Sequence, residues 1–397
     1  MTKYCLTYII VILLFVLANS CDNNKTGKTS AEYDMIKVDI NQTGILDYND
    51  YFASVNLTPL ETNEESLIAQ IDKLYITDKY IIIFDQKAMN ILLFEINGRF
   101  LNKIGSKGNG PDEYAFFNDI QFNKKDSMIY AHERFRNCIY TYDLSGKLIK
   151  KSSRSKISFN SFYKTDEGYW VYSCFESGNP EKHNLMLLDE DLERVKKAFF
   201  PQESFINTTF SSTFITDEKE KVFFIYPSSN IIYELLREDA LPFAQIDFGN
   251  KTMPYKQITQ LKNMDEYDKL IADKKYLGNI SNYKINQNYF FFSFSETGFN
   301  VTVPMYNCFY NFSTKEVNIY KNPFIASMNY PVSSYLLYAS DDVLIYPIYP
   351  MILSDDSFDI LSKTLSADIQ YDSNPILAMS KLKNKREQIT EIHEKCH

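Results

Sequence analysis

The chain has 397 residues, a formal net charge of -9 and an aromatic content of 15%. Phosphate binding needs clustered lysines and arginines, and the body of this chain has no such cluster, so a nucleic-acid-binding role is excluded. The 30 tyrosines and 30 phenylalanines recur in short clusters with β-branched residues, such as residues 80–84 (YIIIF) and 289–294 (YFFFSF). This composition favours β-strands.

The first residues have the pattern of a bacterial lipoprotein signal. Lys3 precedes an apolar run over residues 8–17, and small residues then lead directly into Cys21. The run is shorter than the roughly 20 residues that a membrane-spanning helix needs, and a signal peptidase would cut at this cysteine. We expect residues 1–20 to be removed and Cys21 to be lipidated. Because Ala18 stands where lipoproteins prefer leucine, an ordinary secretory signal is the alternative, and either signal exports the chain.

Four further cysteines lie in the body of the chain at positions 138, 174, 308 and 396. No C-x-x-C or C-x-x-H spacing occurs among them, so we expect neither a structural metal nor a cofactor. In an oxidising compartment a disulfide such as one between Cys138 and Cys174 is one interpretation. Buried thiols are the interpretation that we favour.

The sequence repeats itself from residue 34 onward, where strand-like runs alternate with turn signals. A shift of 48 residues aligns three segments with three later ones: 78–82 with 126–130, 91–95 with 139–143, and 98–100 with 146–148. Each unit contains four strands in about 45 residues, which is typical of a β-propeller blade. Weaker copies make six units in all and span residues 157–200, 210–249, 280–320 and 332–382.

Two segments interrupt this repeat. Residues 254–276 carry apolar side chains at helical spacing with Pro254 at the expected first helical position, which predicts a helix inserted between the fourth and fifth blades. Residues 354–367 are polar and partly helical in pattern, and they divide the sixth unit. The strand-like residues 54–61 remain to pair with the last three strands, which would close the ring and remove its exposed edges.

We therefore predict an all-β fold: a six-bladed β-propeller with four-stranded antiparallel blades, an N-terminal strand that closes the last blade, and short helical insertions. The expected organisation is a lipoprotein signal peptide over residues 1–20, a flexible polar tether over 21–33, the propeller over 34–383 and a charged tail over 384–397.

Residues 104–114 (IGSKGNGPDEY) resemble the G-x-G-P-G-E-Y loop of the six-bladed β-propeller lipoproteins of Bacteroidetes. Residues 57–62 (LTPLET), 143–147 (DLSGK) and 372–377 (DSNPIL) agree with the same family, and the resemblance covers about residues 55–382. Asp112 departs from the pattern, since the family usually has glycine there. The family is distantly similar to NHL-repeat and TolB-like propellers. The resemblance implies a fold and a compartment rather than a chemistry.

Residues 132–136 (HERFR) are the candidate binding feature of the sequence. We expect His132, Arg134 and Arg136 in the loop after the second strand of their unit, where guanidinium groups beside an aromatic ring would recognise a carboxylated or sulfated ligand. A solvated charged loop is the alternative. The glycines of residues 105–110 would present amides to an anion or, as we favour, form a turn between blades. No G-x-S-x-G spacing occurs, and the H-E-x-x-H spacing of residues 393–397 falls in the charged C-terminal tail, so we assign no catalytic residue.

These observations predict a lipid-anchored ligand-binding or protein-interaction module of the cell envelope, on the outer membrane and facing either the periplasm or the outside. Its expected partners are the membrane, through the lipid on Cys21, and a glycan, a peptide or another envelope protein. The alternative is an envelope hydrolase or lyase with its active site at the propeller axis. A metal or a cluster of histidine, carboxylate and arginine at the axis would favour the enzyme, and an apolar plug would favour the binding module. A scaffold subunit with an apolar rim patch is a third candidate.

Overall fold

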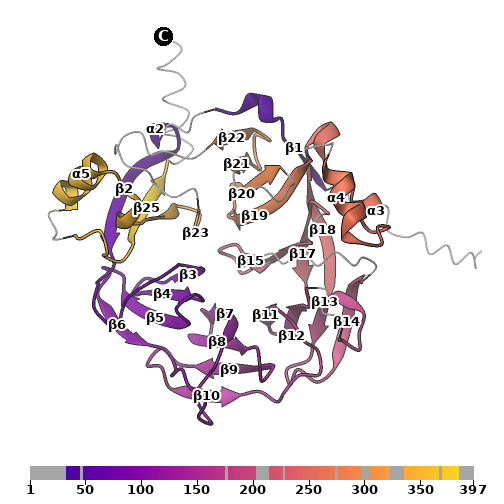
Figure 1. The fold of residues 1–397 in the computed structure, drawn as a ribbon, viewed down its shortest axis with the longest axis horizontal. Helices are drawn as coiled ribbons and strands as arrows, with labels where there is room; N and C mark the ends of the chain where they lie inside the picture. Colours follow the sequence, from indigo (N-terminus) through magenta and orange to yellow (C-terminus); the bar gives the residue numbers. More distant parts are fainter. Residues whose placement is uncertain are drawn as a thin grey trace, which may run out of the picture. The chain divides into compact units, whose positions relative to one another are not determined.

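A computed structural model of the chain describes residues 33–44, 48–174, 178–202, 214–226, 229–272, 276–296, 305–321, 335–365 and 369–383. From Asp34 onward the chain forms one compact unit, in which six β-sheets surround a common centre (Figure 1). The fold is a six-bladed β-propeller of four-stranded antiparallel sheets, as the repeat predicts. The signal, Cys21 and the C-terminal tail lie outside the described residues.

The first three blades follow one another along the chain, and in each the first strand lies nearest the centre (Figure 1). Blade one contains β3 (Lys73–Ile76), β4 (Tyr80–Asp85), β5 (Asn90–Glu95) and β6 (Phe100–Lys103). Blade two contains β7 (Phe117–Asn123), β8 (Met128–Glu133), β9 (Cys138–Tyr142) and β10 (Leu148–Lys151). Blade three contains β11 (Ser161–Thr165), β12 (Gly168–Tyr172), β13 (His183–Leu188) and β14 (Val195–Pro201).

The last three blades use the N-terminal part of the chain as well. Blade four contains β15 (Phe214–Thr216), β16 (Val222–Ile225), β17 (Ile231–Leu236) and β18 (Asp239–Asp247), and β1 (Asp34–Lys37) adds a fifth, parallel strand beside β18. Blade five contains β19 (Leu277–Ile285), β20 (Tyr289–Glu296), β21 (Met305–Asn311) and β22 (Val317–Lys321). Blade six contains β23 (Tyr338–Ala339), β24 (Val343–Ile348), β25 (Ile376–Leu382) and β2 (Phe52–Pro59).

The hydrophobic core lies between neighbouring blades rather than within one of them. In β4, Ile82 packs in one cluster with Ile129 of blade two. The alternate residues Ile81 and Ile83 pack in another cluster with Ile345 of blade six. Because side chains alternate across a strand, a middle strand that is covered on both faces is apolar throughout, which explains runs such as YIIIF.

The sixth blade joins the two ends of the propeller. Strand β2 pairs antiparallel with β25, so that Val55 lies opposite Ser380 and Leu57 lies opposite Ala378. The first strand of the ring thus becomes the outer strand of the last sheet, in the order β2-β25-β24-β23.

Asn374 fastens this closure from the C-terminal side. Its side-chain nitrogen donates to the carbonyl oxygens of Glu61 at 2.7 Å and Ser66 at 2.8 Å, and its side-chain oxygen accepts from the backbone N–H of Ile68 at 2.9 Å. The side chain is buried. The carbonyl oxygen of Glu61 also accepts from Oγ of Ser66 at 2.7 Å, so two backbone groups, the carbonyl oxygen of Ser66 and the N–H of Ile68, depend on this amide for their hydrogen bonds.

The repeated glycine turns are contacts between blades. Gly98 has a φ of +93°, and a Cβ there would lie 2.0 Å from the carbonyl oxygen of Pro59 at the end of β2. Gly146, the equivalent residue of blade two, has a φ of +87°, and its Cβ would lie 2.8 Å from the carbonyl oxygen of Lys103 in blade one. Both positions need glycine for its backbone conformation and for the close approach of the previous blade.

The helices are short. One helix predicted over residues 254–276 is wrong: the segment forms α3 (Tyr255–Ile258) and α4 (Met264–Ala272), with Pro254 as the N-cap residue of α3 rather than its first helical residue. Asn263 caps the N-terminus of the second helix, α4, because its side-chain oxygen accepts from the backbone N–H of Glu266 at 3.0 Å. The insertion lies between blades four and five, as predicted.

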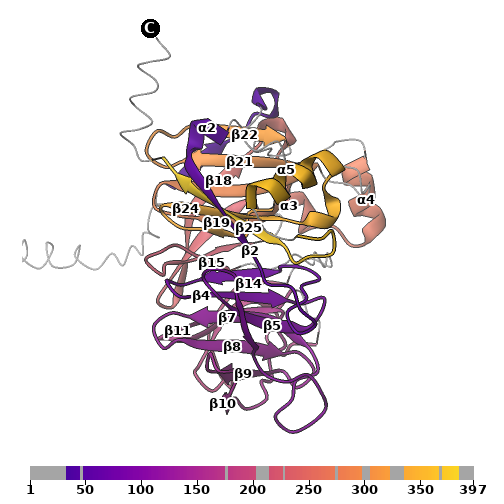
Figure 2. The ribbon, with the colours of Figure 1, turned by 90° about the vertical axis from the view of Figure 1, so that its left-hand side faces the viewer.

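The remaining helices are equally limited in length. They are η1 (Ile40–Gln42), α2 (Tyr48–Tyr51), η2 (Gly249–Lys251), η4 (Pro350–Ile352) and α5 (Asp355–Leu365), and α5 occupies the interruption expected in blade six. Helices α3, α4 and α5 lie on one face of the propeller (Figure 2), here called the helix face. The opposite face carries the turns between the first and second strands of the blades and is here called the hairpin face. No helix of the described residues has the length and apolarity to cross a membrane.

Replacing Asn374 with alanine leaves two buried backbone groups, the carbonyl oxygen of Ser66 and the N–H of Ile68, without their partner. Each unsatisfied buried group costs about 1–3 kcal/mol, so we expect Asn374→Ala to lower the free energy of unfolding by about 3 kcal/mol, measured by chemical denaturation. The control is Asn97→Ala on an exposed turn of blade one, which should cost less than about 1 kcal/mol. Equal losses in both variants would contradict the role of Asn374 in closure.

Candidate functional site

The first strands of the blades enclose a cavity of about 450 Å³. Lining residues come from β3, β7, β11, β15, β19 and β23, so the cavity lies along the propeller axis (Figure 1). Histidine, cysteine and serine are absent from the described residues that line it. The lining instead combines aromatic side chains with amines and carboxylates, among them Tyr75, Tyr163, Tyr335, Tyr338, Lys73 and Lys284.

A buried ion pair forms part of the cavity wall. Nζ of Lys73 in blade one lies 2.5 Å from Oδ1 of Asp119 in blade two, with 16% and 4% of the two side chains exposed. Nζ also donates to the carbonyl oxygen of Ile120 at 3.0 Å, and Oδ2 of Asp119 accepts from the backbone N–H of Phe162 in blade three at 3.0 Å. Burial raises the pKa of Asp119, and Lys73 opposes that rise. The pair connects three consecutive blades.

Side-chain amides on the inner strands bind the backbone of the next blade. Gln121 of blade two donates to the carbonyl oxygen of Lys164 in blade three at 3.2 Å and accepts from its N–H at 2.7 Å. Asn282 of blade five binds Leu336 of blade six in the same two-point manner at 2.7 and 2.8 Å, with its amide oriented to satisfy both atoms. These bonds fix the spacing of the inner strands and therefore the width of the cavity.

Lys284 of β19 brings a second amine to the cavity. Its Nζ is 3.4 Å from the carbonyl oxygen of Tyr283, the preceding residue. Burial, assisted by the positive charge of Lys73, lowers the pKa of Lys284 to about 8. A lysine with a lowered pKa in a cavity marks a candidate functional site.

Carboxyl groups meet at the end of the cavity on the hairpin face. Glu218, in the turn after β15, reaches blade six and hydrogen-bonds both the backbone and the carboxyl group of Asp341. Burial and the nearby Asp341 charge raise the pKa of Glu218. Asp341 also accepts from the backbone N–H of Gln287 in blade five at 2.9 Å. Blades four, five and six are therefore joined at this end.

The residues singled out by the sequence do not line the cavity. His132 was expected in a loop and this is wrong, since it lies within β8 and its side chain is fully buried. Its ring stacks on Phe159 with 4.1 Å between centroids, and Nε2 lies 3.2 Å from Oδ1 of Asn137. Burial lowers the pKa of His132 to about 4.

The two arginines of the same segment point to different partners. Arg134 donates to Oδ1 of Asn160 at 2.6 Å. Arg136 donates to the carbonyl oxygen of Glu113 and to the hydroxyl oxygen of Tyr140, each at 2.6 Å. The structure thus separates His132 from the two guanidinium groups, and the binding role of the three residues stays a prediction.

The glycine-rich loop packs on itself between blades one and two. Oε2 of Glu113 accepts from the backbone N–H of Gly110 at 2.7 Å, and the N–H of Gly108 donates to the carbonyl oxygen of Tyr114 at 2.9 Å. A carboxylate of the chain already occupies the position where an external anion would bind. The turn between blades, favoured from the sequence, fits this arrangement.

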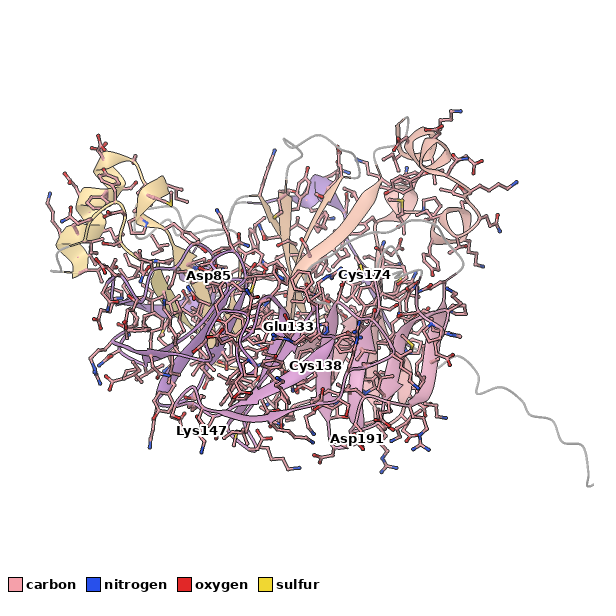
Figure 3. All side chains as sticks on the ribbon, turned by 60° about the horizontal axis from the view of Figure 1, so that its bottom comes forward. Asp85, Glu133, Cys138, Lys147, Cys174 and Asp191 are labelled. Atoms are coloured by element: carbon pink, nitrogen blue, oxygen red, sulfur yellow. The ribbon has the colours of Figure 1, made fainter. Side chains whose placement is uncertain are left out.

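Two fully buried carboxylates escaped the sequence analysis (Figure 3). Asp85, at the end of β4, accepts from the backbone N–H groups of Ala69 at 2.5 Å and Ala88 at 2.7 Å. Glu133, at the end of β8, accepts two backbone N–H groups in the same way, that of Arg136 at 2.6 Å. The 48-residue repeat aligns Asp85 with Glu133 and was the signal that could have revealed them. Both hold loops of the helix face.

The cysteines and metal-ligating residues that the structure describes form no second site. Cys138, Cys174 and Cys308 are buried thiols, as favoured from the sequence, and Cys138 and Cys174 belong to different blades (Figure 3). Cys396 lies outside the described residues. Within the part of the chain that the structure describes, no three histidine, cysteine, aspartate or glutamate residues gather where they would hold a metal ion.

Six four-stranded blades around a lined axial cavity define the chain as a six-bladed β-propeller with a polar and aromatic centre. The chain belongs to the family described as a domain of unknown function, DUF4934, which matches residues 34–381. A comparison with curated proteins found no match to this chain.

Two solved structures have the same fold. An exported protein of Bacteroides fragilis is 15% identical, with a TM-score of 0.69 over 88% of this chain and 100% of its own. A member of the DUF4221 family from Bacteroides vulgatus is 12% identical, with a TM-score of 0.51 over 84% of this chain and 98% of its own. At these identities the likeness concerns the fold alone.

Burial of His132 makes the stability of the propeller depend on pH. Its pKa is about 4 in the folded protein, below the value of 6.5 expected when unfolded. Between these values only the unfolded chain binds the proton, so stability falls as the pH drops from 6.5 to 4, by up to about 3 kcal/mol. In His132→Phe this contribution should vanish, which chemical denaturation at pH 7 and pH 4.5 would measure. An equal loss of stability between pH 7 and pH 4.5 in wild type and in His132→Phe would contradict this prediction.

Proposed function

We propose that this protein is a binding module of the cell envelope that holds a small molecule in its axial cavity. The cavity itself carries the proposal. Its volume of about 450 Å³ lies within the roughly 300–1,000 Å³ of small-molecule sites. Its lining combines aromatic side chains with many charged and polar ones. The inner strands and the hydrogen bonds between them preorganise its wall.

Binding fits the lining residues better than catalysis does. An acyl-transfer or hydrolytic site places a hydroxyl or thiol nucleophile beside a base. The described lining offers two threonines but no histidine. The carboxyl groups of Glu218 and Asp341 contact each other, whereas paired glycosidase carboxylates stand at least ~5 Å apart to admit a substrate.

The envelope location is supported by two independent observations. The first residues combine Lys3, a short apolar run and Cys21 in the pattern of a lipoprotein signal. The similar structure from Bacteroides fragilis is described as that of an exported protein. We propose that Cys21 carries the lipid anchor and that the protein faces the periplasm or the cell exterior. We also propose that it resembles NHL-like and TolB-like envelope propellers in function as well as in fold.

Filling the cavity should abolish ligand binding without unfolding the propeller. Ile215 of β15 lines the cavity, whereas Ile149 of β10 is 49% exposed on the outer edge of blade two. In a thermal-shift screen of saccharides, peptides and organic acids, a cavity ligand at a hundredfold excess over its Kd stabilises the protein by about 2.7 kcal/mol. We expect this stabilisation in wild type and Ile149→Trp and its loss in Ile215→Trp.

Two results would contradict the proposed function. One is a ligand that stabilises Ile215→Trp as much as wild type, because that ligand binds outside the cavity. The other is a flat response of the wild-type protein to the whole screen, which would favour a protein-interaction scaffold. The melting temperature of Ile215→Trp without ligand shows whether the variant is folded.

The lipid anchor is tested by exchanging cysteines in the signal. We expect Cys21→Ser to abolish incorporation of an alkyne-labelled fatty acid and to shift the protein from the membrane to the soluble envelope fraction. Cys5→Ser, which changes the other cysteine of the N-terminal segment, should leave both properties intact. Labelled, membrane-bound Cys21→Ser protein would show that Cys21 is not the lipidated residue.

A further inference from the structure

The amine of Lys284 lacks an acidic partner in the cavity. Among the described residues its one hydrogen bond runs to the carbonyl oxygen of Tyr283 at 3.4 Å, near the limit for such a bond. The charge that acts on it is the cation of Lys73. A desolvated ammonium group without a counterion is costly, and an anion in the cavity would relieve that cost.

Lys73, another lysine of the inner strands, shows an amine of the same cavity whose hydrogen bonds are satisfied. Nζ of Lys73 has a carboxylate at 2.5 Å, that of Asp119, and a carbonyl acceptor at 3.0 Å, that of Ile120. Asp119 in turn is engaged by Lys73 and by backbone N–H groups. Lys73 and Asp119 therefore neutralise each other, whereas no carboxylate of the described residues pairs with Lys284.

The walls around Lys284 suit a ring. Tyr163, Tyr335 and Tyr338 line the same cavity from blades three and six. Phenol rings present flat faces for stacking and hydroxyl groups for hydrogen bonding. A volume of about 450 Å³ leaves room for one six-membered ring with its substituents.

We propose that the axial cavity selects a small organic monoanion, a six-membered ring carrying one carboxylate, and that the ammonium group of Lys284 pairs with this carboxylate. The inference rests on the proposed function, because it names the ligand class of the same cavity. The single ammonium group of Lys284 matches one carboxylate, whereas a dianion would leave its second charge without a partner beside this lysine. The carboxylate restores to Lys284 the kind of partner that Asp119 gives Lys73.

Two classes of molecule carry a carboxylate on a six-membered ring, sugar acids and aromatic acids, and two pairs of probe ligands distinguish them. Isothermal titration calorimetry at pH 7 would compare glucuronate with glucose and benzoate with benzamide. We expect wild-type protein to bind one acid at least tenfold more tightly than its neutral partner. Lys284→Met should lose at least tenfold in affinity for that acid and bind the neutral partner unchanged. Lys150→Met, which removes an exposed lysine of β10, should behave as wild type.

The pH dependence provides a readout that a structural role of Lys284 would not give. The lysine is protonated below its pKa of about 8 and neutral above it. The affinity of wild-type protein for the acid should therefore fall about fivefold between pH 8 and pH 9, as the charged fraction falls. The neutral partner should show no such change, and neither ligand should show it with Lys284→Met or Lys284→Gln. The two variants together guard against a folding defect in one of them.

The possible failures are distinguishable. Equal affinity of the acid for wild type, Lys284→Met and Lys284→Gln would overturn the pairing with Lys284, while the proposed function would stand if Ile215→Trp abolished that binding. If neither acid bound and a neutral ligand bound in the cavity, the proposed ligand class would be overturned, and the proposed function would stand. Silence of all four probes together with a flat thermal-shift screen would overturn both proposals.

Discussion

The antiparallel pairing of β2 with β25 is the constraint on which the rest of the structure depends. Six sheets that each bury both faces against their neighbours need every sheet to have two neighbours, and only a closed ring provides them. The hydrogen-bonded pairing of residues near 55 with residues near 380 closes the ring. Asn374 and Gly98 stabilise the adjoining turns. With the ring closed, the first strand of every blade faces a common axis.

The axial cavity follows from how the inner strands are connected. Asp119, Gln121 and Asn282 each reach sideways to the backbone of the next blade. Polar side chains engaged in this way keep the strands apart, and the space that they leave at the axis remains lined by tyrosines and amines. The same network leaves Lys284 without a carboxylate. Structure and candidate function therefore have one origin, the polar character of the inner strands.

Much of the fold could be predicted from the sequence, because its middle strands repeat every 48 residues in the first two blades and have continuous apolar runs. The site could not, because the inner strands mix polar with apolar residues and the copies that contain Lys284 and Tyr335 are weak. His132 was misplaced for a related reason: HERFR has the composition of a loop, yet Glu133 is buried to accept two backbone N–H groups. The helix over residues 254–276 failed because the side chain of Asn263 caps a second helix within a regular apolar pattern. The added strand β1 left no periodic signal.

Closure by an N-terminal strand also governs how the polypeptide acquires its structure. Strand β2 leaves the ribosome more than 300 residues before β25, its partner in the register that joins Val55 to Ser380. Contacts of such long separation form slowly, because the chain pays the entropy of closing a large loop first. Until the last segment is available, blade six lacks its central pairing and the blades beside it lack one covered face. A growing chain of this design stays unfinished throughout synthesis, and the proposed location in the envelope would make use of this delay, because an unfolded chain is the form that can be threaded through a membrane.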